Sequence, residues 1–379
     1  MRTDRGGQRR TGADRGGQGR TGADGGGQGR AMTGRAIRVG VIGCGYWGPN
    51  LARNFARHPG SQLQAVCDVR YERATRVGAE YRVPTITDRP EELLKAPDLD
   101  LVVIATPSFT HYEQTKAALE AGKHALVMKP LATRAEQAEE LCALAEKHGV
   151  LLAVDHTFVF TGAVRKMKQL VEAGEIGDLY YFDSVRINLG LIQADVNVIW
   201  DLAPHDVSIM DHLIGQAPVS VAATGAAHGG SPTENIAYLT VRFPGSLIGH
   251  VHVNWLAPAK VRRTIVGGSK RMMIYDDVEP SEKLKIYDKG FTVAQAPAPE
   301  NEYELLISYR SGDMHAPQLD TREALAIEAE NLVRAIGGKE PLVADGRAGW
   351  RVVRILEAAQ KSIEQGGETV VMSPAARGA

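Results

Sequence analysis

A glycine-rich segment that follows an apolar run constrains the fold more than any other feature of this chain. The stretch VGVIGCGYWGPNLARNF, from Val39 to Phe55, contains the pattern G-x-G-x-x-G. The run AIRVGVI before it is typical of a buried strand, and residues 49–55 have helical spacing. Gly43 permits a sharp turn, Gly45 lets the backbone approach a pyrophosphate, and Gly48 lets helix and strand pack closely. The segment therefore predicts a dinucleotide site.

An acidic residue at the end of the next strand supports this interpretation. The segment SQLQAVCD ends at Asp68, 20 residues after Gly48, where an acid binds the ribose hydroxyls of NAD. An aspartate after a strand is also a common turn residue or helix cap, but strand, glycines, helix, strand and acid together favour the dinucleotide. The carboxylate repels the 2′-phosphate of NADP and so favours NAD, although Arg70 and Arg73 are close enough to weaken that preference.

Strands and helices continue to alternate up to residue 155. DLDLVVIA and HALVM read as buried strands, and each is followed by a helical segment. Residues 35–155 thus predict an α/β Rossmann domain with a doubly wound parallel sheet, whose ligand lies beyond the carboxyl ends of the strands. The expected cofactor-binding residues are Gly43, Gly45, Tyr46, Trp47, Gly48, Asp68, Thr106, Pro107, His111 and Lys129.

The remaining part, residues 156–379, has a different pattern. Seven segments with mostly alternating polarity, from DLYYFDSVRINLG to EKLKIYD, predict an α+β domain with one large, mostly antiparallel open sheet. Helical periodicity is expected at 163–173, 321–336 and 348–365. An uncovered sheet face favours association with another copy, so we expect a homodimer or homotetramer.

Composition excludes several classes of protein. A chain of 379 residues suits two domains, and a formal net charge of −1 does not attract nucleic acid. The chain contains no run of about 18 apolar residues, so we expect no membrane span. The N-terminus has no apolar core of a signal peptide, so no secretory signal is indicated. Cys44, Cys67 and Cys142 lack metal-binding spacing, so we expect reduced thiols, no metal site and a cytoplasmic protein.

The first 34 residues form a Gly/Arg-rich tail with a ten-residue period and almost no apolar residues, which predicts disorder. An Arg/Gly-rich nucleic-acid tail is one interpretation. We favour another, because the ten-nucleotide unit CGGACAGGGG, read through three successive frames, encodes the ten residues from Arg10 to Gly19. We therefore expect translated repeat DNA, with Met32 as the natural start.

One segment of the second part combines an acid and an imidazole. In VIWDLAPHDVSIMDHLIG, Asp201 and His205 are four residues apart at the start of a helical pattern, and so lie on one helix face. Pro204 is tolerated in a first helical turn, which predicts that Asp201 lies near the N-cap. His205 is a candidate proton carrier. A helix cap and a packing histidine would give the same spacing.

The segments GCGYWGPN, IATPSFTH, KHALVMKPLA, DSVRINLG and WDLAPHD, in this order, resemble the glucose-fructose oxidoreductase, inositol dehydrogenase and rhizopine catabolism (Gfo/Idh/MocA) family over residues 36–372. The resemblance implies a Rossmann domain, a large-sheet domain and NAD(P)-dependent redox chemistry at a ring carbon of a sugar, cyclitol or sugar nucleotide. It also implies that Lys129, Asp201 and His205 are catalytic and contact the substrate.

One position departs from the family. Met128 stands where the family usually has a glutamate, so the lysine of the motif is kept while a neighbouring carboxylate is lost. We expect that the loss of this carboxylate changes either the electrostatic environment of Lys129 or the conformation of the loop around it. In the mechanism that the resemblance implies, His205 takes the hydroxyl proton and Lys129 stabilises the alkoxide.

Several substrates remain open at this point. The segment RINLGLIQADVNVIWDLAPHD resembles the branch that acts on nucleotide-linked sugars, including 3-dehydrogenases, and by that resemblance Arg186, Asn188 and Asn197 are candidate substrate contacts. Strand-face or turn roles would also suit these three residues. The alternatives are an inositol or free-sugar dehydrogenase, a ketoreductase of deoxysugar or aminoglycoside assembly, and a sensor that binds NAD and a sugar without turnover.

Overall fold

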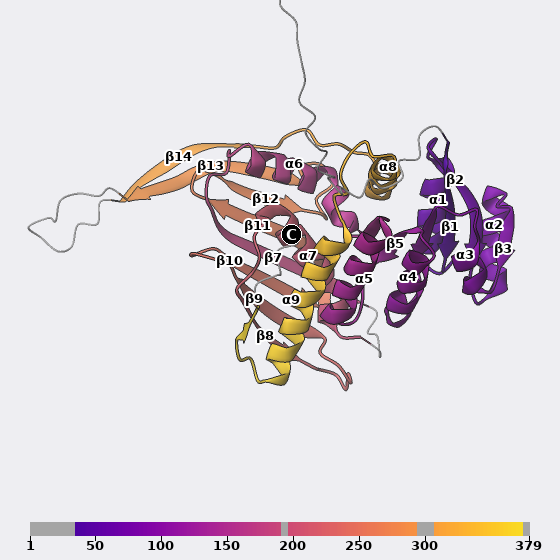
Figure 1. The fold of residues 1–379 in the computed structure, drawn as a ribbon. Coiled ribbons are helices and arrows are strands. Elements are labelled where there is room, and N and C mark those ends of the chain that lie inside the picture. The colour runs from indigo at the N-terminus through magenta and orange to yellow at the C-terminus, as the bar shows by residue number, and fades with distance from the viewer. Residues whose placement is uncertain (1–34, 191–195, 294–306, 374–379) are drawn as a thin grey trace, which may run out of the picture.

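The computed structural model describes residues 35–190, 196–293 and 307–373. The expectations for the tail, residues 1–34, lie outside the described residues, as do residues 191–195 of the segment compared with the nucleotide-sugar branch. Figure 1 shows two sheets, with the smaller one at one side of the molecule and the larger one at the other.

The first sheet has six parallel strands in the order β3-β2-β1-β4-β5-β6, with the reversal between β1 and β4 that characterises a doubly wound fold. Its strands are β1 (Ile37–Ile42), β2 (Ser61–Cys67), β3 (Thr85–Thr87), β4 (Leu101–Ile104), β5 (His124–Met128) and β6 (Leu152–Asp155). Both faces are covered, which explains why β4 and β6 are buried along their whole length. The predicted parallel sheet is confirmed.

Five α-helices and a short 3₁₀ turn connect these strands. They are α1 (Gly48–Arg57), α2 (Tyr71–Tyr81), α3 (Pro90–Lys95), η1 (Ser108–Thr110), α4 (His111–Glu120) and α5 (Ala135–His148). Gly149 ends α5 with a φ of +63° in the left-handed region, a conformation that favours glycine. The loops that leave β1, β4 and β5 all open at one edge of the sheet, where a ligand of this fold binds.

The second sheet has nine strands in the order β14-β13-β12-β11-β7-β10-β9-β8-β15. They are β7 (Leu179–Leu189), β8 (Ser220–Ala226), β9 (Ile236–Arg242), β10 (Ile248–Asn254), β11 (Leu256–Gly268), β12 (Met272–Asp276), β13 (Leu284–Val293), β14 (Ile307–His315) and β15 (Val370–Val371). Among the strand pairs of this sheet that the structure describes, β7 and β10 alone are parallel, so the predicted mostly antiparallel sheet is confirmed. The edge strands β14 and β15 were not predicted, since neither has a clear alternating pattern.

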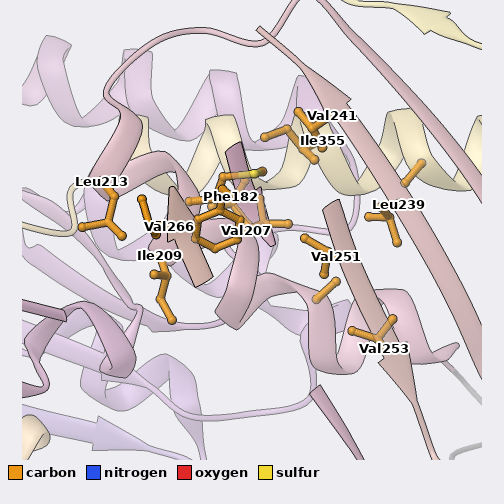
Figure 2. Close-up of a cluster of buried hydrophobic side chains, with 14 of the residues drawn as sticks. Phe182, Val207, Ile209, Leu213, Leu239, Val241, Val251, Val253, Val266 and Ile355 are labelled. Carbon is orange, nitrogen blue, oxygen red and sulfur yellow. The ribbon is translucent and has the colours of Figure 1, made fainter. Parts of the chain in front are cut away.

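Helices cover one face of this sheet. They are α6 (Gly162–Glu172), which follows the 3₁₀ turn η2 (Thr157–Phe160), α7 (Val198–Ile214) and α9 (Gly346–Glu364), and Figure 1 shows α7 and α9 lying across the same face. Phe182, Val207 and Val251 meet in the buried cluster between helices and strands (Figure 2). This cluster anchors α7, the helix that bears Asp201 and His205.

Helix α7 begins earlier than the sequence indicated. Its N-cap is Asn197, whose side chain accepts hydrogen bonds from the backbone N–H groups of Ile199 and Trp200. The prediction that Pro204 occupies the first turn was wrong, because Pro204 lies inside the helix and removes an interior backbone donor. Asp201 still lies in the first turn.

The last two helices return to the first domain. Leu325, Ala329 and Leu332 of α8 (Ala324–Ile336) belong to the buried cluster of β1 and α1. Helix α9 contributes Trp350 and Val353 to the core of the first domain, while its Val352 and Ile355 lie in the core of the second. The two domains are therefore joined by shared hydrophobic packing as well as by the chain.

We expect Leu332→Ala to destabilise the protein by about 2–5 kcal/mol, since Leu332 is 1% exposed and its removal leaves a cavity under the first sheet. Urea unfolding followed by circular dichroism measures this change. Val371→Ala is the control, because Val371 is 80% exposed and should change stability by less than about 0.5 kcal/mol. Equal effects of the two substitutions would show that α8 does not contribute to this core.

Candidate active site

The glycine loop between β1 and α1 has a backbone that tolerates no side chain at two positions. Gly43 has a φ of +95°, and a Cβ there would lie 2.3 Å from the carbonyl oxygen of Ala105. A Cβ on Gly48 would lie 1.8 Å from the carbonyl oxygen of Gly43. At Gly45 the nearest atom to a Cβ would be Arg73 Nη1, at 3.9 Å, so the loop presents bare backbone to the cleft. This cradle fits a pyrophosphate.

The start of α1 suits an anion as well. Trp47 caps the helix without a side-chain hydrogen bond, and the first turn has no acidic residue, so the positive end of the helix dipole is not neutralised there. The Tyr46 and Trp47 rings are exposed and lie edge to face beside this end.

Asp68 follows β2 and joins the glycine loop to the next helix. Its carboxylate accepts the backbone N–H of Cys44 at 2.7 Å and that of Arg70 at 2.9 Å. The side chain is largely buried yet lines the cleft, together with Arg70 and Arg73. Each carboxylate oxygen retains a lone pair, which suits a ribose hydroxyl.

A cleft of about 1440 Å³ runs from this loop to the second domain. Its lining includes Gly43, Gly45, Asp68, Thr106, Pro107, Lys129 and Asp201. On the far side it reaches Asn197 and the end of α9. The cleft therefore connects the expected cofactor residues with part of the expected substrate site.

His111 lies behind the cleft. Its ring is fully buried, with Nδ1 2.7 Å from the carbonyl oxygen of Pro130 and Nε2 2.9 Å from that of Thr106. Because the ring is buried and both of its nitrogens face backbone carbonyl oxygens, it presents no surface to a dinucleotide. This differs from the expectation that His111 contacts the cofactor. His111 instead braces the two loops that do line the cleft.

Lys129 and Asp201 meet across the two domains. Lys129 Nζ donates to the Asp201 carbonyl oxygen at 2.6 Å and lies 3.3 Å from the carboxylate Oδ1. Burial lowers the pKa of Lys129, while the charge of Asp201 and its hydrogen bond oppose that shift. The structure thus brings together two of the three residues expected to be catalytic.

His205, one helical turn after Asp201, does not bond to it. The ring packs edge to face on Phe158, with centroids 5.0 Å apart, and Nδ1 is buried with no hydrogen-bond partner among the residues that the structure describes. Burial, followed by the charges of Lys129 and Arg186, holds the pKa of His205 well below its usual value. The imidazole is therefore neutral at physiological pH.

Met128, the residue that replaces the family's glutamate, packs partly buried in the first core and pairs in register with Asp155 of β6. Lys129 retains a carboxylate environment from other positions, because Asp201 and Asp155 both act to raise its pKa. The expected loss of a neighbouring carboxylate is thus partly offset by residues distant in sequence.

The three expected substrate contacts have different surroundings. Arg186 is 3% exposed and forms a buried ion pair with Asp206 at 2.6 Å, with its guanidinium over the Phe158 ring. Asn197 caps α7 and also donates to Glu234 and Gln360. Asn188 is partly exposed near the end of β7. Of the three, Asn197 lines the cleft.

Trp255 is a site residue that sequence reasoning missed. Its indole N–H donates to Asp201 Oδ2 at 3.1 Å. A tryptophan 54 positions away, between two strands, carries no sequence signal for this contact, because the pairing depends on the sheet register.

Comparison with known proteins identifies the family. A family described as oxidoreductases with an NAD-binding Rossmann fold (Gfo/Idh/MocA) matches residues 37–156, and its C-terminal domain matches residues 164–274. The chain belongs to this Gfo/Idh/MocA oxidoreductase family, and its first domain binds NAD.

Individual relatives cover most of the chain. A UDP-N-acetylglucosamine 3-dehydrogenase of Acidithiobacillus ferrooxidans is 30% identical over 84% of this chain and 94% of that protein. Its crystal structure has a TM-score of 0.74 at 28% identity, covering 87% of this chain and 98% of the other. The uncharacterized oxidoreductase YdgJ of Escherichia coli is 33% identical over 65% of this chain and 73% of its own.

We expect Asp68→Ala to weaken NADH binding by about ten- to a hundredfold, since a charged hydrogen-bond acceptor is lost. NADPH binding should weaken less, because the carboxylate that repels the 2′-phosphate is also removed. Calorimetry with both dinucleotides measures this, with the exposed Asp88→Ala as control. Equal weakening of NADH and NADPH would indicate loop damage instead of a lost ribose contact.

Proposed function

We propose that this oxidoreductase oxidises a ring carbinol, at C3, of a nucleotide-linked sugar. The observation that carries the proposal is the Lys129 ammonium bound by Asp201 at the cofactor edge of the cleft, with a neutral His205 one turn further along α7. The extended similarity to a UDP-N-acetylglucosamine 3-dehydrogenase supports this substrate class.

Two features of the cleft suit the dinucleotide: the bare backbone at Gly45, and the start of α1, where no side chain forms a capping hydrogen bond. Gly43, Gly45 and Gly48 would hold its pyrophosphate, Asp68 its ribose, and the Thr106–Pro107 turn its nicotinamide end. When bound, NAD supplies the hydride acceptor.

Side chains of the protein then accept the proton of the substrate hydroxyl and stabilise the negative charge on its oxygen. Neutral His205 accepts the proton of the substrate hydroxyl, and Lys129 stabilises the oxygen as negative charge develops on it. Asp201 keeps the ammonium in place. The lowered pKa of His205 leaves the imidazole free to accept a proton, and the contact with Asp201 favours the charged form of Lys129 that stabilises the oxygen.

We further propose that two or four copies associate through the open face of the large sheet. Tyr181 and Tyr238 are exposed, and Tyr238 stacks on His252 with ring centroids 4.3 Å apart.

Three buried free cysteines support a cytoplasmic location. In the part of the chain that the structure describes, no helix is long and apolar enough to span a membrane.

We expect reduced-nicotinamide absorbance to appear when the protein and NAD meet a nucleotide sugar, and His205→Asn to lower turnover by about 10²- to 10⁴-fold with NAD still bound. The panel includes free sugars and cyclitols. A signal with these alone would indicate the free-sugar or inositol type. If NAD binds but no compound of the panel produces the absorbance, the protein is a reductase or a sensor without turnover. A reductase would oxidise NADH when it is given ketosugars.

The pH profile of kcat/KM tests the two protonation states. Because burial disfavours the ammonium, Lys129 should lose its proton below the value of about 10.4 of a free lysine, and activity should fall above that midpoint. Loss on the acid side should begin below the usual histidine value of about 6.5, since the pKa of His205 is lowered. Lys129→Arg should remove the alkaline fall, because a guanidinium stays charged.

A further inference from the structure

The Asp201 carboxylate has a different partner at each oxygen. Oδ1 faces the Lys129 ammonium at 3.3 Å, and Oδ2 accepts the Trp255 indole N–H at 3.1 Å. Among the residues that the structure describes, the Lys129 ammonium has two acceptors, the backbone carbonyl oxygen of Asp201 at 2.6 Å and its carboxylate Oδ1 at 3.3 Å. Rotation of the carboxylate therefore changes the contact of the ammonium with Oδ1 and leaves its hydrogen bond to the backbone carbonyl in place.

Trp255 is itself held on several sides. It is 1% exposed and packs in the core of the second domain. Its backbone N–H donates to the Asn235 carbonyl at 2.9 Å, and its carbonyl accepts the Gly190 N–H at 3.0 Å. A Cβ on Gly190 would lie 2.7 Å from Trp255 Cδ1, so Gly190 lets the chain approach the indole closely. A ring so enclosed cannot follow a moving carboxylate.

The chemistry of the donor makes the contact specific. An indole has one N–H donor and no acceptor, and a buried donor left unpaired costs free energy. Asp201 supplies its acceptor, so the ring and the carboxylate fix one another.

We propose that Trp255 is a positioning residue for the reaction, whose indole N–H holds the Asp201 carboxylate so that the Lys129 ammonium stays at the cofactor edge of the cleft. This inference rests on the proposed function of Lys129. It assigns a role in the site to a residue between two strands of the large sheet, 126 positions away from the lysine.

Trp255→Phe tests the role, because it keeps an aromatic ring and removes the donor. We expect kcat to fall about ten- to a hundredfold with NAD affinity unchanged. The alkaline limb of the pH profile should move to lower pH, because a carboxylate released from the indole no longer stays beside the ammonium, and Asp201 then opposes the effect of burial on the pKa of Lys129 less strongly. A general loss of packing would lower activity without moving this limb.

Gly190→Ala is a second variant that keeps the donor and displaces the ring. It should move the limb in the same direction by a smaller amount. Trp350→Phe is the matched control: Trp350 lies in the other core with its ring beside Arg347 and Arg354, and its replacement should leave both kcat and the limb unchanged. The proposal is overturned if Trp255→Phe leaves the limb where it is.

A readout without turnover separates this inference from the proposed function. Titration of ¹³C-labelled lysine side chains by NMR should show a lower Lys129 midpoint in Trp255→Phe than in the unaltered protein. The indole N–H resonance of Trp255 should shift in Asp201→Asn. If no substrate is turned over yet both changes occur, the proposed function fails and the positioning contact stands. If activity is found and neither change occurs, the positioning role fails alone.

Discussion

The contact between the Lys129 ammonium and Asp201 is the interaction on which the rest of the site depends. It joins the end of β5 in the NAD-binding domain to the first turn of α7 in the second domain. A buried ammonium is stable only with acceptors at hydrogen-bond distance. The contact therefore links the two domains at the cleft itself, through atoms that the proposed chemistry uses.

Shared packing keeps this contact in register. Helix α8 completes the core of the first sheet, and α9 contributes apolar side chains to both cores. Because close-packed interiors yield little, the distance across the cleft is constrained by these helices at positions remote from it. A domain division at residue 155, as the sequence indicates, describes the order of the chain but not the composition of the first core.

Sequence reasoning located the NAD-binding edge well, because its signals are local. Glycines at fixed offsets, an apolar run before them and an acid after the next strand all lie between Ala36 and Asp68. The second domain was harder. The start of α7 was placed late, since Asn197 as N-cap competes with Pro204 as a helix-start signal. Arg186 suggested a substrate contact, whereas the fold pairs it with Asp206 in the interior.

The sequence by itself determined the fold class and the dinucleotide edge, since strand and helix periodicity and the glycine spacing are local patterns. It singled out Lys129, Asp201 and His205 through their motifs, which resemble those of the family. Tertiary structure alone decided that Asp201 bonds to Lys129 and Trp255 instead of to His205. It also decided that His111 braces two loops behind the cleft. Hydrogen bonds between residues 54 to 72 positions apart depend on strand order and domain packing, which no local pattern encodes.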